Sequence, residues 1–305
     1  MSIRPIKQIS GTQPTMEGAG VHLHRVFGFD DPTLTDPFLM MDDFRNDDPA
    51  AYKKGFPWHP HRGIETITYV LAGSVDHADS LGNAGSLGPG SVQWMTAGSG
   101  ILHQEMPKGD TFGRMHGFQL WANLPSSEKM TTPRYQDIAG KDIDEIVEDD
   151  GTRVRVITGD FWGKKGPVDG IAADPLYLDI YIPPLKAKRF PVDTYRSAFA
   201  YIFEGEGTFK DASKPFGVLV EKEVGGEEIH MRDMSGDRTL VLFDTGDEVV
   251  VHSGERGIRF LLIAGKPIQE PVAWHGPIVM NTQAELQQAF ADLRTGNFIR
   301  EQARL

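Results

Sequence analysis

Two short segments of this chain carry side chains of the kinds that bind metal ions. His59 and His61 are separated by one residue, and so are His103 and Glu105. On a β-strand, residues two apart point to the same face of the sheet. Two such strands side by side would aim three imidazoles and one carboxylate at a common point. The spacing therefore predicts a metal site with nitrogen and oxygen donors and no sulfur.

Four donors leave part of a coordination sphere open. An octahedral ion bound by three histidines and one carboxylate keeps two positions for water, oxygen or a chelating substrate. Iron(II) in oxygenases uses imidazole and carboxylate ligands with open positions of this kind. Donor type alone does not choose the metal, so Fe, Mn, Ni, Cu and Zn all stay open at this point.

A second carboxylate competes for the fourth ligand position. If the strand that begins at His59 continues without a bulge, Glu65 shares the parity of His59 and His61. That face would then run from the ligands into the apolar Ile67 and beyond, and Thr66 and Thr68 would point outward. The residues alone leave Glu65 and Glu105 both open as the fourth ligand.

The other histidines are expected to have no direct part in metal binding. His22 and His24 alternate on one predicted strand without a partner motif, which favours an exposed edge. His77 stands at the entry to a turn, where loop hydrogen bonding is its expected role, and His116 is a candidate neighbour of the ligands. The isolated ones, interpreted as structural or exposed, are His230, His252 and His275.

Short strands are the elements that must position these side chains. Gly and Pro are abundant, with 34 and 20 residues in a chain of 305, and they separate brief alternating or apolar runs. Turn signals at such intervals indicate a barrel or a sandwich. The expected strands are 21–27, 64–71, 91–97, 101–106 and 116–122 in a first block, and 176–182, 197–203, 239–244 and 257–264 in a second.

The two blocks predict two domains related by a diverged internal duplication. Residues 1–135 are expected to form an N-terminal metal-binding barrel, and residues 136–305 a second barrel without metal. A polar bridge over 136–175, with an acidic loop at 142–150, would join them. At the end of the chain Thr282 and Glu285 form a capping box, and the apolar residues that follow recur at helical spacing until Gly296. We expect a C-terminal α-helix that packs on a barrel.

Composition excludes several classes of function. A net charge of −12 argues against direct nucleic-acid binding, which needs a basic face. The chain has no cysteine, so it has no disulfide, no thiolate ligand and no thiol switch. No apolar run resembles a signal peptide or approaches the roughly 20 residues that cross a membrane. A cytoplasmic protein without membrane contact is expected.

At this point the residues match a family. The run HPHRGIETITYVLAGSVDHADSLGNAGSLGPGSVQWMTAGSGILHQEMP, which starts at His59, resembles the pirin family very closely. The later segments RMHGFQLWANLP and GPIVMNTQAELQQAF are also similar to pirin sequences, so the resemblance spans nearly the whole chain. It implies an all-β fold of two cupin-type β-barrels, a bicupin, with the C-terminal α-helix. It also implies one metal ion, in the N-terminal barrel only.

The resemblance also implies the site residues. Carried onto this sequence, the pirin ligands are His59, His61, His103 and Glu105. Glu65 then becomes a residue near the metal rather than a ligand. Iron, as Fe(II), is the usual metal of the family.

Three functions are compatible with such a site. Some pirins are similar in activity to quercetin dioxygenases, so the first hypothesis is an Fe(II) dioxygenase that cleaves a flavonol such as quercetin with O2, with Glu105 as the catalytic base. Other pirins are described as regulators, so the alternative is a metal-dependent redox-sensing protein that binds a protein partner without catalysis. The third is an isomerase or hydrolase that uses the metal as a Lewis acid.

Overall fold

The computed structural model describes residues 2–210, 221–224, 227–230 and 234–300, which fall into two compact units interleaved along the sequence. We call the first the histidine unit; it consists of Thr12–Asp144, Gly166–Pro175 and the chain from Lys266 on. The second, the apolar unit, consists of the chain up to Gly11, Glu145–Lys165 and Leu176–Gly265. Each unit has its own sheets and its own core.

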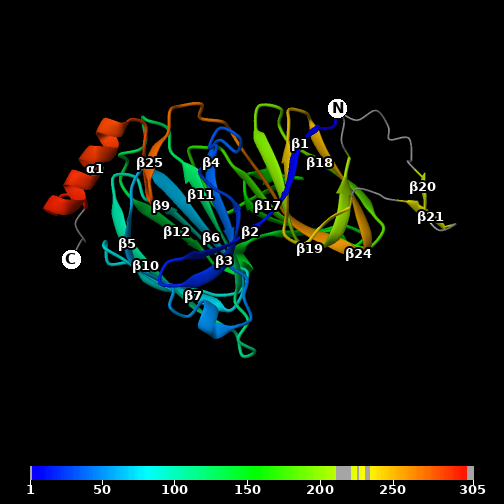
Figure 1. Ribbon diagram of the computed structural model, residues 1–305, viewed down its shortest axis with the longest axis horizontal. Coiled ribbons are helices and arrows are strands. Elements are labelled where there is room, and N and C mark those ends of the chain that lie inside the picture. Colours follow the sequence, from blue (N-terminus) through cyan, green and yellow to red (C-terminus); the bar gives the residue numbers. More distant parts are fainter. Residues whose placement is uncertain (1, 211–220, 225–226, 231–233, 301–305) are drawn as a thin grey trace. The chain divides into compact units, whose positions relative to one another are not determined.

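The histidine unit contains two main sheets (Figure 1). The larger has the strand order β12-β9-β6-β11-β4-β3-β2, and the smaller has the order β5-β10-β7-β8. A short pair, β25-β26, precedes the helix α1. Two short 3-10 turns, η1 (Pro49–Ala51) and η2 (Gly140–Asp142), also belong to this unit. The bounds of its strands and helix are β2 Gln13–Glu17, β3 Val21–Phe27, β4 Phe38–Asp43, β5 Phe56–His61, β6 Ile64–Ala72, β7 Ser74–Asp79, β8 Ala84–Leu87, β9 Val92–Thr96, β10 Ile101–Lys108, β11 His116–Asn123, β12 Arg134–Ile138, β25 Ala273–His275, β26 Ile278–Met280 and α1 Gln283–Thr295.

The apolar unit is built around one large sheet. Its strand order is β1-β23-β19-β24-β17-β14-β13, with β18 paired to β24 and β22 paired to β19. Two hairpins, β15-β16 and β20-β21, lie outside this sheet. The bounds are β1 Ile6–Gly11, β13 Glu145–Val147, β14 Arg153–Thr158, β15 Asp160–Phe161, β16 Lys164–Lys165, β17 Leu176–Ile182, β18 Ala187–Pro191, β19 Ser197–Phe209, β20 Glu221–Val224, β21 Glu227–His230, β22 Ser235–Gly236, β23 Thr239–Phe243 and β24 Glu248–Gly265.

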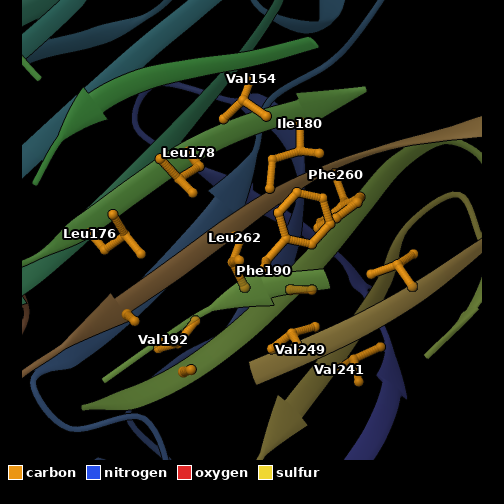
Figure 2. Close-up of a cluster of buried hydrophobic side chains, with 14 of the residues drawn as sticks. Val154, Leu176, Leu178, Ile180, Phe190, Val192, Val241, Val249, Phe260 and Leu262 are labelled. Atoms are coloured by element: carbon orange, nitrogen blue, oxygen red, sulfur yellow. The ribbon is translucent and has the colours of Figure 1, made fainter. Parts of the chain in front are cut away.

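Figure 2 shows the core of the apolar unit, where side chains from β14, β17, β18, β23 and β24 converge. Along β17 every second residue enters this core, from Leu176 to Ile182, as the period of a strand requires. Phe190 is fully buried and its ring contacts those of Phe161 and Phe260. Aliphatic and aromatic side chains fill this interior, so hydrophobic burial is what holds the unit together.

The predicted all-β fold with a C-terminal helix is confirmed, and every expected strand overlaps an observed one. The helix α1 has the predicted capping box: Glu285 N donates to Thr282 Oγ1 over 3.2 Å, and the Glu285 carboxylate accepts from Thr282 N. Gly296 ends the helix in the left-handed conformation, with φ of 78°. Figure 1 shows α1, in red, beside β25.

The two units do not follow the expected division at residue 135. The first strand β1 pairs antiparallel with β23 and so belongs to the apolar unit. The C-terminal helix packs on β26 and belongs to the histidine unit instead of the second barrel. The pairing of β1 with β23 and the bond from Arg62 to Asp292 of α1 join residues far apart in the chain, and a boundary drawn from local composition cannot detect them.

The acidic segment is also more ordered than predicted. Part of it, Glu145–Val147, forms strand β13, which pairs with β14 so that Glu145 stands opposite Arg155. Ile146, between the exposed Glu145 and Val147, packs against the apolar core. Two consecutive β-branched residues, together with a cross-strand pair of opposite charge, explain a strand here. Separately, none of the helices in the described part of the chain is long and apolar enough to span a membrane.

Candidate metal centre

The predicted ligand strands lie side by side. Strand β5 pairs antiparallel with β10, and His59 stands directly opposite His103. Along β10 the buried residues alternate with partly exposed ones, and His103 and Glu105 are on the buried face. An extra residue on β5 after this pair shifts the register, so Glu105 stands opposite Phe56. The pairing brings His59, His61 and His103 together as the spacing predicted.

The three imidazoles form a compact donor group. One ring nitrogen from each of His59, His61 and His103 lies within 4.8 Å of the others, and the Nε2 atoms of His59 and His61 are 3.0 Å apart. With metal–nitrogen bonds of about 2.1 Å, neighbouring octahedral ligands lie about 3.0 Å apart and opposite ones about 4.2 Å. The pair His59 and His61 already has the spacing of neighbouring octahedral ligands.

Backbone carbonyls set the orientation of two rings. His59 Nδ1 lies 2.9 Å from the carbonyl oxygen of Pro57, and His61 Nδ1 lies 3.3 Å from that of Pro277. A carbonyl only accepts, so each Nδ1 carries the proton and each Nε2 of a neutral ring keeps its lone pair. Two lone pairs that face each other across 3.0 Å repel unless a cation lies beside both. This is the arrangement that metal-binding histidines adopt.

Burial favours the neutral form of two of the rings, those of His61 and His103. His103 is fully buried, and neither ring nitrogen has a hydrogen-bond partner among the residues that the structure describes. Burial lowers the pKa of His103, and the nearby His59 and His77 lower it further. For His61, burial again lowers the pKa well below the usual range, followed by the effects of His59 and His103. Neutral imidazoles are the form that binds metal, and an unpartnered buried nitrogen is a donor that a cation would satisfy.

Glu105 lies next to this group but outside the donor set found among the described residues, which contains the three histidines. Its Oε1 is 3.0 Å from the hydroxyl of Thr68, which is also 2.7 Å from Gln119 Oε1. Burial raises the pKa of Glu105, while His59 and the hydrogen bond from Thr68 partly oppose that rise. A nearby cation would favour the carboxylate form.

The predicted continuation of the ligand face into β6 is wrong. Gly63, with φ of 78°, separates β5 from β6, and the two strands belong to different sheets. After this break Thr68 faces Glu105, although it was expected to point outward. Glu65 points to the face of β6 opposite that of Thr68, and it accepts a hydrogen bond from Thr96 over 2.7 Å. Burial raises the pKa of Glu65 to about 7, and the hydrogen bond from Thr96 limits that rise.

The sequence interpretation of His77 is also wrong. His77 is a buried residue of β7, directly opposite Glu105 on β10, and not a loop residue. Its ring stacks on Tyr135 at 5.9 Å, and its Nε2 lies 3.5 Å from the carboxylate of Asp137. Gly85 on β8 makes room for the ring, because a Cβ there would lie 2.6 Å from His77 Nε2. The alternation of Val75, His77 and Asp79, all buried, was the signal that could have placed it.

The remaining histidines lie away from the donor group. His24 Nδ1 is 3.2 Å from the hydroxyl of Thr12, and the side chain of His22 is exposed. His116 packs its ring against Phe118. His252 and His275 are exposed, as predicted, and the side chain of His230 lies outside the described residues.

Two β units, one with three convergent imidazoles in its interior and one with an apolar core, define a two-domain cupin protein. The Pirin family model matches residues 20–122, and the model of the pirin C-terminal cupin domain matches residues 177–299. The chain belongs to the pirin family. The two predicted cupin domains are thereby confirmed.

Whole-length relatives agree with this assignment. A pirin-like protein from Caulobacter vibrioides is 43% identical over 299 residues, which cover 98% of this chain and 100% of that protein. A Pseudomonas aeruginosa protein, named provisionally as a quercetin 2,3-dioxygenase, is 39% identical and covers 96% of this chain and 97% of its own length. The crystal structure of a quercetin 2,3-dioxygenase from Acinetobacter baumannii matches with a TM-score of 0.82 at 29% identity, over 97% of this chain and 98% of that one.

Proposed function

We propose that this protein is a metal-dependent dioxygenase that cleaves a flavonol such as quercetin with O2 and releases carbon monoxide. The proposed metal is Fe(II), held by His59, His61 and His103, with Glu105 as the fourth ligand. The relatives from P. aeruginosa and A. baumannii carry the name of this activity and support the substrate class. A divalent ion in this site would lower the pKa of a substrate hydroxyl and leave positions for substrate and oxygen.

The facing Nε2 atoms of His59 and His61 are the single observation that carries the proposal. Their 3.0 Å separation, with both Nδ1 protons directed to carbonyls, leaves two lone pairs that only a cation or an additional proton can bring together. Since burial lowers the pKa of His61, an additional proton is disfavoured there. The donor set contains nitrogen and oxygen atoms, which suits Fe(II) and other first-row metals.

Glu105 is the proposed base. The carboxylate is buried beside the donor group, and Thr68 holds its Oε1 by a hydrogen bond. Its other oxygen, Oε2, would accept the proton of a flavonol hydroxyl placed at the metal. Trp121 packs its ring edge-on against His61 at 5.1 Å and gives this side of the site an aromatic wall. An apolar wall with few polar groups suits a planar aromatic substrate.

An oxygen-dependent assay tests the proposal. The protein is loaded with Fe(II) without air and mixed with quercetin, and O2 is then admitted. We expect loss of the flavonol absorbance band, uptake of O2 and release of carbon monoxide. Parallel samples with Mn, Ni, Cu and Zn determine which metal supports turnover.

The Glu105→Gln variant tests the base at full metal loading. It should bind Fe(II) more weakly, because a proposed ligand is lost, and when the three histidines are saturated with the ion it should still lose about 100-fold or more in turnover, the usual contribution of a general base. Glu255→Gln makes the same change at an exposed position of the apolar unit and serves as the control. Fully loaded protein that leaves every flavonol unchanged would refute the proposed activity.

A further inference from the structure

We propose that the C-terminal segment Ala273–Arg300 sets the metal affinity of the site by clamping the residues after His61, with Asp292 as the positioning residue. This inference rests on the proposed metal centre. The C-terminal cupin model includes this segment, yet in the structure it belongs to the histidine unit. The clamp has two parts, one built on Arg62 and the other on Gly63.

Arg62 directly follows His61 and is buried, with 2% of its surface exposed. Its Nε donates to the carbonyl of Ser99 over 2.7 Å, and Ser99 lies just before β10, the strand of His103. One terminal nitrogen donates to Asp292 Oδ2 over 2.7 Å, and the other donates to the carbonyl of Phe298 over 2.9 Å. A single guanidinium thus ties the ends of both ligand strands to α1 and to the chain beyond it.

The second part of the clamp holds Gly63 against β26. Val279 N donates to the carbonyl of Arg62 over 3.0 Å, and a Cβ at Gly63 would lie 1.9 Å from the carbonyl oxygen of Val279. The buried ammonium of Lys129 donates to both the Gly63 and the Val279 carbonyls, at 2.9 and 3.2 Å. The backbone of β26 is therefore in direct contact with the backbone of Arg62 and Gly63, and only glycine fits at position 63.

The clamp reaches the ligand itself through Pro277. The carbonyl of Pro277 accepts from His61 Nδ1, and no side chain can replace this backbone oxygen. Its position depends on how well the C-terminal segment is held, and Asp292 is the charged anchor of that segment. Partners that orient a metal-bound histidine contribute about 10–100-fold to metal affinity. Asp292 does not touch the ligand and acts through the segment that carries Pro277. Its loss should therefore weaken metal binding by about tenfold.

Metal binding by the Asp292→Asn variant tests the inference. Co(II) is the probe, because its absorption spectrum reports the ligands and its dissociation constant can be measured by competition with a chelator. We expect the dissociation constant for Co(II) to rise about tenfold and the Co(II) spectrum to change. Circular dichroism and the unfolding midpoint of the metal-free protein should show that the variant is folded. Asp292→Glu should recover part of the affinity, because the carboxylate can still pair with Arg62.

Asp47→Asn is the matched control. It makes the same exchange at an exposed position of the histidine unit, outside the segment Ala273–Arg300. Its Co(II) affinity should equal that of the unaltered protein. Gln288→Ala is a milder probe, because it removes only the amide that donates to Asp292 Oδ1 over 2.7 Å, and we expect about threefold weaker binding.

Two results would overturn the inference. The first is a folded Asp292→Asn variant that binds Co(II) within a factor of two of the unaltered protein. If that variant does not fold, unchanged affinity in Gln288→Ala has the same meaning. If the unaltered protein itself binds no divalent metal, the proposed metal centre fails together with the clamp, so the two failures are distinguishable.

Discussion

The interiors of the two units differ in what fills them. In the apolar unit, aliphatic and aromatic side chains from β14, β17 and β24 pack into one core. In the histidine unit, the same kind of strand places imidazoles, carboxylates and hydroxyls inside, among them His103, Glu105 and Thr68. Among the residues that the structure describes, the grouped metal donors are all in the histidine unit.

This difference means that the histidine unit has polar groups in its interior at a cost in stability. A buried polar group lowers stability unless it is hydrogen-bonded, and His103 has no such partner for either nitrogen. Hydrocarbon in the same place would stabilise the unit, as it does in the apolar one. We therefore expect a ligand at His103, because a sequence usually departs from good packing at its functional site.

Removal of one imidazole should give the largest effect. His103→Ala deletes a donor that β10 supplies, and we expect metal affinity to fall by more than the about 100-fold that an outer partner costs. Elemental analysis after dialysis against Fe(II) measures this loss. His252→Ala, at an exposed histidine of the apolar unit, should bind metal normally. Equal iron contents in both variants would mean that the histidine unit and the apolar unit do not differ in metal binding.

A cavity in the apolar unit should lower the free energy of unfolding and leave metal affinity unchanged. Phe190→Ala removes a fully buried ring that contacts Phe161 and Phe260, and such truncations cost about 3–5 kcal/mol. Denaturant unfolding measures the loss, and a Co(II) titration of the native variant should show unchanged affinity. If the native variant binds metal much more weakly, the apolar core also supports the site.

The pH dependence of stability should report on Glu65. Its pKa is about 7 in the folded protein and near 4.5 when unfolded, so the folded state binds more protons between these values. Stability should therefore fall as pH rises from about 4.5 to 7 and stay lower above that range. Glu65→Gln should be more stable than the unaltered protein by up to about 3 kcal/mol at pH 8, with the difference vanishing below pH 4.5. Unfolding curves at both pH values test this, and a constant difference would contradict it.

The smallest effect concerns the hydroxyl that holds Glu105. Thr68→Val keeps the shape of the side chain and removes its hydrogen bond to Glu105 Oε1. We expect metal affinity to fall by about tenfold, the lower end for a partner of a ligand. Isothermal titration with Co(II) gives the value, and Thr66→Val makes the same exchange two residues away on β6. Identical losses in both variants would argue against a specific role for the Thr68 hydroxyl.

That the ligand residues of each strand share one face could be predicted from the sequence, because it depends on local spacing. Residues two apart share a face, and His59 with His61 and His103 with Glu105 obey that rule on β5 and β10. The capping box of α1 is equally local. The predicted parity of β6 was wrong because Gly63 breaks the strand. The role predicted for His77 was wrong because β7 continues past it to Asp79 before the turn begins.

Long-range features could not be predicted in the same way. That Pro277 orients His61, or that Asp292 anchors Arg62, depends on contacts between residues more than 200 positions apart. No periodicity or composition indicates which strand or helix such a segment will meet. The division into units was wrong for the same reason, since β1 pairs with the distant strand β23, and Leu102 of β10 packs against the cluster of apolar side chains under α1.

Anomalous diffraction at the iron edge, from crystals grown with Fe(II) without air, tests the central claim most directly. The account predicts one peak for each chain, bound by ring nitrogens of His59, His61 and His103 at about 2.1 Å. A peak elsewhere, or no peak at full Fe(II) loading, would contradict a metal centre on these two strands.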